Sequence, residues 1–582
     1  MSELTGRRRL VRPPLLCLLA TFAATAWSQE LPRYYAHEAV LDANGVIAPW
    51  YRRQNGPLDL RVRVAAETLK RYPWTERPRP APHYVFSGAW GIAPDGTISI
   101  PPIDNWSNGD LGQRAAYVLS GLVDYYRYSG DPAAISHIAI TADALIDFCQ
   151  TPADHPWPRF LVSVPTKGMP YGVTDPHGFI QLDIVAEVGI GMVRAYELVG
   201  ERRWLEAAKH WADLLVQHCD LRPGAPPWPR YANPEDVPWE DHCTGGVVFM
   251  LAFFDELERV GYTGRRGELT RAREAGEAYL RDTLLPRWTE DGTWGRNYWD
   301  WNDPVQAENV TEFAVRYMME HPSRFPNWRN DCRNVLSLFL NRTSVARESN
   351  GDVFSGAWAY PESSGCCGRS LWYGPFELAP IYAQYSELTG DEWAREMARR
   401  QLILATYDVH ETGVVEDNID GGPIVAGAWF KIAHPMALKH ALNGMAWLPD
   451  LMGAARENHI LRASAVVRHV QYGVGDIRYE TAETIAPCVD VVRLAFEPAK
   501  VTADGVRLAA RGDLAANGFT TRRLECGDVI LTIRHDGRKR VAILGPDPGQ
   551  AADDTELTFE GPWRAANRAG DAGGTAHAAA AA

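Results

Sequence analysis

The sequence lacks the features that mark nucleic-acid-binding and membrane-spanning proteins. Its 582 residues include 59 Lys and Arg against 73 Asp and Glu, a formal net charge of −14. Because nucleic acids and anionic membranes are bound by basic surfaces, this balance argues against both as partners. After the N-terminal segment there is no run of 18 apolar residues, so the sequence predicts no transmembrane helix. It also contains no Gly-rich phosphate loop, nucleophile elbow or HExxH motif, which removes the enzyme classes that those motifs mark.

Phenylalanine is scarce beside the amphipathic aromatic residues. There are 17 Phe, against 21 Trp and 23 Tyr. Rings with a polar edge suit a surface that stacks on a partly polar ligand, and a sugar is the obvious ligand of that kind. A Trp-rich core gives the same composition, so composition alone leaves both interpretations open.

The first residues have the pattern of an export signal. Four Arg lie within the first 12 residues, and an apolar segment (LLCLLATFAATA) follows at 15–26. Small residues then precede a cleavage point after Ser28, so we predict a signal peptide over 1–28 and a secreted or periplasmic protein. Export permits disulfides, and we predict one between Cys488 and Cys526, which share the C-terminal domain.

One pattern recurs between residues 105 and 455. A helix of small and apolar residues ends in an aromatic residue, and a Gly-containing turn leads into an amphipathic helix, as in 196–204 (YELVGERRW) and 385–393 (YSELTGDEW). Acidic residues that precede the first helix of each unit recur at steps of 65, 65, 68, 54 and 58 residues. They are Asp110, Asp175, Glu240, Glu308, Glu362 and Asp420. This period predicts six helical hairpins, which either close into a ring or form an open solenoid.

In its repeat length and its YxLxGDxxW turn, the region 105–455 resembles the six-hairpin glycosidase superfamily. The resemblance implies a mainly α fold, an (α/α)6 barrel or toroid with the small-residue helices inside and the amphipathic helices outside. It is less informative about the reaction, because that superfamily holds both glycoside hydrolases and polysaccharide lyases.

The flanking segments differ from the repeats in composition. We expect residues 29–104 to form an N-terminal extension that packs on the toroid. After residue 456, Val- and Ile-rich runs alternate with Gly and Asp turns, which predicts a small C-terminal β-sandwich over 456–565. The Ala- and Gly-rich residues 566–582 are predicted to form a disordered tail.

The candidate catalytic residues are the acids at the entrances of the inner helices, because such loops converge on one face of a toroid. Glycoside hydrolysis needs two carboxylates. We predict Glu362 as the acid or nucleophile, with Glu308, Asp175 and Glu240 as candidate partners. Further acids at such positions are Asp110, Asp183, Asp241, Glu312, Asp417 and Asp420. For any one of them, capping of a helix N-terminus is the more ordinary role.

Aromatic and basic residues near these acids are the predicted substrate-binding residues. Aromatic faces bind sugar rings, and apolar surroundings raise the pKa of a carboxyl group towards that of a working general acid. The predicted set is His177, His242, Trp239, Tyr298, Trp301, Trp358, Tyr360, Arg369, Trp429 and His434. The basic members and Lys431 would also suit a uronic-acid substrate.

An adjacent pair, Cys366 and Cys367, follows Glu362. This segment resembles the β-L-arabinofuranosidase family that uses a zinc-bound cysteine nucleophile, which implies a zinc site made of the two thiols and Glu308. The chain departs from that family at Val310, where the family has a further Cys, and at Gly368, where it has a Pro-rich stretch. A disulfide from one of the pair to another Cys, or two buried thiols, remain alternatives.

The sequence therefore predicts a secreted glycoside hydrolase acting on a plant, algal or bacterial polysaccharide or its oligosaccharides, with no obligatory cofactor. A polysaccharide lyase on the same fold, with Tyr or His as the base, is one alternative. A non-catalytic glycan-binding protein is the other. We expect no nucleic-acid or membrane partner.

Overall fold

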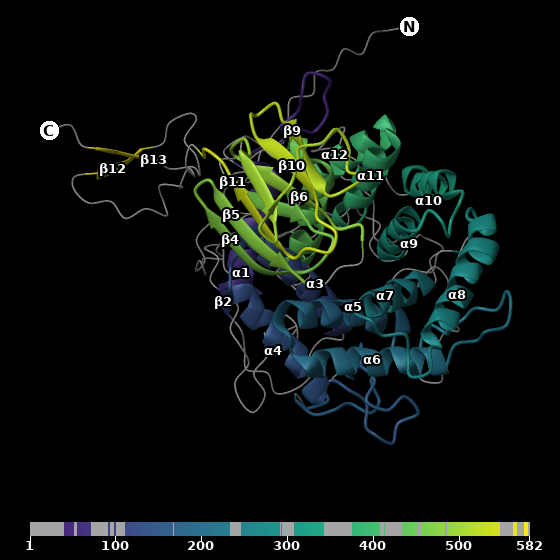
Figure 1. Cartoon of the computed structure of the whole chain (residues 1–582). Coiled ribbons are helices and arrows are strands. Elements are labelled where there is room, and N and C mark those ends of the chain that lie inside the picture. Colours follow the sequence, from purple (N-terminus) through teal and green to yellow (C-terminus); the bar gives the residue numbers. More distant parts are fainter. Residues whose placement is uncertain are drawn as a thin grey trace, which may run out of the picture.

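The computed structural model describes residues 40–51, 55–71, 91–92, 98–99, 111–166, 168–170, 172–232, 246–290, 293, 308–342, 375–407, 413, 433–451, 457–482, 486–547, 563–566 and 576–579. Within them the chain is mainly helical up to residue 451 and β-rich afterwards, as the sequence predicts (Figure 1). None of the described helices is both long and apolar enough to cross a lipid bilayer.

Six helical segments form an inner ring. They are α3 (Leu111–Ser129), α5 (Leu182–Val199), α7 (Val247–Arg259), α9 (Glu308–Glu320), α11 (Pro375–Thr389) and the run of α13 (Ala433–Met436), η6 (Ala437–Ala441) and α14 (Leu442–Trp447), called here the sixth inner helix. Each packs on the next, and η6 packs back on α3. The contacts therefore close the ring, and an open solenoid does not describe this arrangement.

A second set of helices lies outside the ring. In chain order these are α1 (Gly56–Arg71), α4 (Ala133–Phe148), α6 (Arg202–Gln217), α8 (Leu269–Tyr279), α10 (Trp328–Arg342) and α12 (Glu392–Leu404), with η3 (Leu280–Leu284) and η4 (Leu285–Arg287) continuing α8. The N-terminal helix α1 packs on η6, α13 and α12. It supplies the outer partner of the sixth inner helix, because the chain passes from that helix to the sheets through only the short η7 (Pro449–Leu451).

The repeated turn works by helix capping. Gly200 ends α5 with φ +88°, and its N–H donates to the Tyr196 carbonyl. Glu201 then caps α6 by accepting from the Arg203 N–H. In the second copy of the turn, Gly390 has φ +75°. A residue with a Cβ is strained at such φ values, so the turn requires glycine at this position. This requirement is what makes the turn recognisable in the sequence.

The C-terminal part consists of two antiparallel sheets. One has the strand order β3-β6-β10-β9, and the other β4-β5-β11-β7-β8. The strands are β3 (His459–Arg462), β4 (Val467–Gly473), β5 (Asp476–Thr481), β6 (Val489–Leu494), β7 (Lys500–Ala503), β8 (Val506–Arg507), β9 (Gly518–Arg523), β10 (Val529–Arg534) and β11 (Arg540–Leu544). Strand β3 contacts α3 and α14, and β4 contacts α3 and α5, so the sheets lie against one end of the ring (Figure 1).

Two short ladders lie outside these sheets. Strands β1 (Gly91–Ile92) and β2 (Ile98–Ser99) pair with each other, as do β12 (Trp563–Ala566) and β13 (Ala576–Ala579). Of the second ladder, β13 and the last residue of β12 fall in the stretch 566–582 predicted as a disordered tail, and there the backbone pairs as a strand.

The described tryptophans belong mainly to the core. Trp204, Trp211 and Trp228 have side chains that are essentially completely buried. Trp204 Nε1 donates to Asp143 Oδ1 at 2.7 Å, and Trp228 Nε1 donates to the Leu215 carbonyl at 2.8 Å. For these residues the aromatic excess reflects packing of the outer helices rather than a sugar-binding surface.

The predicted disulfide between Cys488 and Cys526 is wrong. Cys488 precedes Val489, at one end of the β6–β10 ladder, whereas Cys526 lies in the turn before Val529, which pairs with Leu494 at the other end. Five residue steps along a strand span about 16 Å. A disulfide needs Cα atoms within about 7 Å, so the register keeps the two thiols apart.

Candidate functional site

A cavity of about 500 Å³ lies inside the ring of helices. Its wall includes side chains from all six inner helices, and residues 462–467 of β3 and the following loop cover one end. Glu187 of α5, Glu312 of α9 and Lys439 of η6 belong to this wall. We call the cavity the lumen.

These three charged side chains form a buried ionic cluster. Lys439 Nζ lies 3.1 Å from Glu187 Oε1 and 3.6 Å from Glu312 Oε2. Glu187 and Glu312 are each 1% exposed, and Lys439 is 7% exposed. Lys439 also lies 5.0 Å from the ring centroids of Tyr117 and Phe313, whose faces shelter the ammonium group. Because burial of charges costs free energy, such clusters are more common at functional sites than in ordinary cores.

Glu312 is held in its charged form. Burial raises its pKa, but the positive charges of Lys439 and Arg316 outweigh burial and bring the pKa to about 2. Arg316 Nη2 donates to Glu312 Oε1 at 2.9 Å. The other carboxylate oxygen, Oε2, is buried and accepts no hydrogen bond within the described part of the chain. Glu312 thus presents an ionised oxygen on the lumen wall.

Glu377 of α11 is held in the opposite state. Burial raises its pKa to about 8, and the charge of Glu312 adds to this, although a hydrogen bond from Tyr117 opposes it. The Tyr117 hydroxyl donates to Glu377 Oε1. At neutral pH Glu377 is therefore mainly protonated, while Glu312 is ionised. Two carboxyl groups with pKa values driven apart in this way are suited to act as an acid and a base.

His440 lies beside Glu312. It is completely buried, and its Nδ1 is 3.8 Å from Glu312 Oε2. Burial lowers its pKa to about 3, so the ring is neutral at neutral pH. Neither ring nitrogen has a hydrogen-bond partner among the described residues, and the Tyr117 ring packs edge-on against it at 5.8 Å. A neutral imidazole with two unsatisfied nitrogens is available for proton transfer or for a polar ligand.

The end of the lumen near the sheets is lined by paired charges. Arg194 and Arg259 bind Glu256, with Arg194 Nη2 at 2.6 Å from Glu256 Oε1. The guanidinium of Arg462 differs, since it stacks 3.8 Å from the Trp447 ring centroid and its buried Nε has no hydrogen-bond partner in the described part. Burial lowers the Arg462 pKa to about 10.

The structure places three of the predicted site residues in different surroundings. Asp175 is 2% exposed and accepts from the backbone N–H groups of Thr166 and His177, which fixes the loop before α5. His177 itself is exposed. His434 is completely buried, with Nδ1 at 3.2 Å from Arg61 Nη1 and Nε2 at 3.0 Å from the Gly413 carbonyl. The structure does not bring these residues into the ionic cluster.

The remaining predicted residues have no described side chain. Glu308 begins α9, but its side chain is outside the described part. The others lie outside the described residues altogether: Glu362, Glu240, His242, Trp239, Tyr298, Trp301, Trp358, Tyr360, Arg369, Trp429, Cys366 and Cys367. The zinc site, which depends on the last two and Glu308, stays a prediction.

Sequence reasoning found Glu312 but missed the other members of the cluster. Tyr117, Glu187 and Lys439 lie inside the inner helices rather than in the loops before them, whereas Glu377 lies in the first turn of α11. A signal was present for Glu187, which is a charged residue in a stretch otherwise made of small and apolar residues (IVAEVGIGM at 184–192). Burial of a polar side chain costs free energy unless it is hydrogen-bonded or paired, so such a residue inside a closed ring is a candidate functional residue.

The chain matches no protein-family model and no curated protein. Its structure is similar to that of cellobiose 2-epimerase from Spirochaeta thermophila, with a TM-score of 0.49 and 14% identity over 68% of this chain and 97% of that chain. It is also similar to a family 76 glycoside hydrolase from Bacteroides thetaiotaomicron, with a TM-score of 0.46 and 12% identity over 70% and 83%. At such identities and TM-scores, neither likeness assigns an activity to this chain.

Proposed function

We propose that the chain is a carbohydrate-active enzyme built on an (α/α)6 toroid, and that it hydrolyses glycosidic bonds in the lumen with Glu312 and Glu377. One observation carries this proposal. Carboxyl groups from two inner helices meet around a single buried lysine from a third, at the wall of a cavity large enough for a sugar unit. The repeat pattern that resembles the six-hairpin glycosidases supports the same class.

The two glutamates take complementary roles in this reaction. Glu377, protonated at neutral pH, donates a proton to the oxygen of the departing sugar. Glu312, ionised, acts as the base or the nucleophile at the sugar carbon. Lys439 keeps Glu312 charged, and the Tyr117 hydroxyl orients the Glu377 carboxyl group. Glu362, Glu308 and Glu240 stay proposed contributors at the entrance of the inner helices.

The proposed substrate is an extracellular polysaccharide, or oligosaccharides derived from it, of plant, algal or bacterial origin. The export signal predicted over residues 1–28 supports this location. The paired guanidinium and carboxylate groups in the lumen wall supply hydrogen-bond donors and acceptors for sugar hydroxyl groups.

A polysaccharide lyase is the second candidate. Such an enzyme removes the proton next to a uronate carboxyl group and needs a base together with a cation that neutralises the acid. The Tyr117 hydroxyl and the Lys439 ammonium lie in one cluster, which is the pair of groups that this reaction requires.

A panel of neutral and acidic glycans, followed with two readouts, tests the proposal. Hydrolysis releases new reducing ends without ultraviolet absorbance, whereas a lyase also forms a 4,5-unsaturated product that absorbs in the ultraviolet. We expect reducing ends alone. Matched growth of both signals establishes the lyase, and binding of glycans without either product leaves a binding protein and contradicts both enzymatic proposals.

A further inference from the structure

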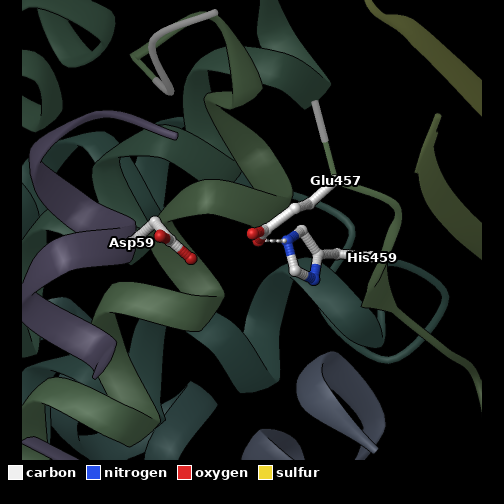
Figure 2. A group of neighbouring side chains, drawn as sticks. All are labelled: Asp59, Glu457 and His459. Atoms are coloured by element: carbon white, nitrogen blue, oxygen red, sulfur yellow. Dashed lines mark hydrogen bonds and ion pairs between the residues drawn. The ribbon is translucent and has the colours of Figure 1, made fainter. Parts of the chain in front are cut away.

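A second group of buried polar side chains lies away from the lumen, where α1 meets the start of β3. It contains Asp59 of α1 together with Glu457 and His459, which are separated from Asp59 by most of the chain. One carboxylate oxygen of each acid and a ring nitrogen of the histidine all lie within 4.8 Å of one another. Figure 2 shows the Asp59 carboxylate directed toward the Glu457 and His459 side chains. Asp59 is 1% exposed and His459 is 7% exposed.

The orientation of His459 is set by the backbone of α3. Its Nδ1 lies 2.9 Å from the Tyr128 carbonyl oxygen, and its ring stacks on the Tyr128 ring at 3.9 Å. A carbonyl oxygen only accepts hydrogen bonds, so Nδ1 carries a hydrogen. The other ring nitrogen, Nε2, faces Glu457 Oε2 at 3.2 Å. One ion placed between these two atoms can bind both of them. Histidines that bind metals have this arrangement, with the second ring nitrogen bonded to a carbonyl.

A fourth side chain supplies an independent sign of a missing partner. The Asn55 amide makes a side-chain hydrogen bond to Glu457 and contributes to lowering the pKa of that carboxyl group. Asn55 is 2% exposed, and its Oδ1 has no hydrogen-bond partner among the described residues. Buried amide oxygens are rarely left unsatisfied, so an oxygen of this kind on a residue bonded to the Glu457 carboxylate points to a cation.

The charges around Asp59 complete the environment. Asp59 Oδ1 accepts from the Tyr128 hydroxyl at 2.5 Å. Asp59 Oδ2 lies 2.8 Å from Arg63 Nε, in a geometry that does not form a hydrogen bond. The two carboxylates together with Arg63 carry one net negative charge. A divalent ion is therefore compatible with the balance of charge.

We propose that Asp59, Glu457 and His459, with Asn55 Oδ1 as a further ligand, bind one divalent metal ion. Three oxygens and one imidazole nitrogen suit Zn²⁺ or Mn²⁺ better than a cation that takes only oxygen ligands. The ion would join α1 to the segment that enters β3. Its role is to fasten the N-terminal helix to the sheets, and it takes no part in chemistry in the lumen.

In the competing arrangement the cluster holds no ion, and His459 forms hydrogen bonds with both Tyr128 and Glu457. The two arrangements differ in whether the purified protein retains a metal. We would remove metals with EDTA, load the full chain with Zn²⁺ or Mn²⁺ alone, pass it through metal-free buffer, and measure bound metal by elemental analysis and Tm by calorimetry. We expect about one ion per chain of one of the two metals, and a Tm several degrees higher in the loaded protein.

Conservative variants locate the ion. Asp59→Asn and His459→Gln keep the shape of the cluster and should lose this ion together with the metal-dependent rise in Tm. His535→Gln is the matched control, because His535 also lies between a carbonyl (Arg538, 2.7 Å) and a carboxylate (Asp490, 2.8 Å) but is not part of the cluster. It should keep the ion and the rise in Tm.

Glu457→Gln is the variant to use if Asp59→Asn does not fold, because the Glu457 side chain is 27% exposed and its loss disturbs the core least. Wild-type protein that binds neither metal at micromolar concentrations would overturn the proposal. Metal binding that is unchanged in Asp59→Asn, His459→Gln and Glu457→Gln would overturn it as well, since the ion would then lie elsewhere, for example at the predicted Cys366 and Cys367 site.

Discussion

Lys439 Nζ lies 3.1 Å from Glu187 Oε1, so a single buried contact joins the sixth inner helix to α5 across the ring. The same ammonium group lies 3.6 Å from Glu312 on α9. One cation therefore compensates two buried carboxylates from different helices. Both the stability of the ring and the ionisation of Glu312 depend on this residue.

Replacing Lys439 tests the electrostatic role of the cluster. Lys439→Met leaves two buried carboxylates without their cation, so we expect a loss of about 3–5 kcal/mol in the free energy of unfolding. Combining it with Glu187→Gln removes one of these charges, and the double variant should be more stable than Lys439→Met alone. Chemical denaturation of the four proteins measures this cycle. Equal stability of the double variant and Lys439→Met would show that Glu187 and Lys439 are not coupled.

The pH dependence of turnover tests the role of Glu377. An acid with a pKa of about 8 donates a proton only below that pH, so kcat/KM should fall as the pH rises through about 8. Glu377→Gln should lose at least about 100-fold in kcat on natural glycans and lose this alkaline limb. Aryl glycosides with a good leaving group need no proton, so the variant should retain most activity on them.

Glu387→Gln is the matched control, because Glu387 lies at the exposed end of the same helix. It should keep the wild-type profile. An alkaline limb that persists in Glu377→Gln would assign that titration to another group.

His137 predicts how stability changes with acid. Burial lowers its pKa from 6.5 to about 4 in the folded protein. Between pH 6.5 and 4, His137 is protonated in the unfolded chain but not in the folded protein. Its contribution to the free energy of unfolding is therefore complete above pH 6.5 and is lost as the pH falls towards 4. We expect a loss of roughly 3 kcal/mol from this group.

His137→Gln removes the titration. Its free energy of unfolding should therefore fall less steeply between pH 6.5 and 4, by up to about 1.4 kcal/mol per pH unit. Denaturant unfolding at several pH values measures both slopes. Parallel slopes for the two proteins would mean that His137 is protonated equally well in the folded state.

Gly189 tests the close packing of α5 on α7. A Cβ at this position would lie 2.4 Å from Cζ of Phe253, whose side chain is fully buried. Gly189→Ala should therefore cost about 1–3 kcal/mol in unfolding free energy, in spite of the better helix propensity of Ala. Gly512→Ala, where a Cβ meets nothing within 4 Å, is the control and should be nearly neutral. A Gly189→Ala protein as stable as wild type would contradict this packing.

The parts of the fold that sequence predicts well are those determined by neighbouring residues. Gly200 and Glu201 cap the two helices of one hairpin, and the same local rules mark each repeat. Such local rules do not predict the role of α1 as the outer partner of the sixth inner helix. Its place beside the sixth inner helix follows from closure of the ring, which depends on contacts between the two ends of the helical region.

The residues of the candidate site also divide into those that local sequence predicts and those that depend on the closed ring. Glu312 lies close to a helix start and was found among the acids of the helix entrances. Glu377 and Lys439 act through contacts with Tyr117 and Glu187, which come from helices distant in sequence. Their pKa values depend on burial and on neighbours that only the closed ring brings together, so residue type and spacing do not reveal them.

Turnover by Glu312→Gln tests the central claim most directly. On the glycan that the panel identifies, kcat should fall at least about 100-fold, because a buried amide can neither accept a proton nor attack the sugar. Binding of the same glycan, measured by calorimetry, should stay within about threefold, since Gln keeps the size and hydrogen-bonding capacity of Glu. Near-normal turnover by a folded Glu312→Gln protein would contradict catalysis in the lumen.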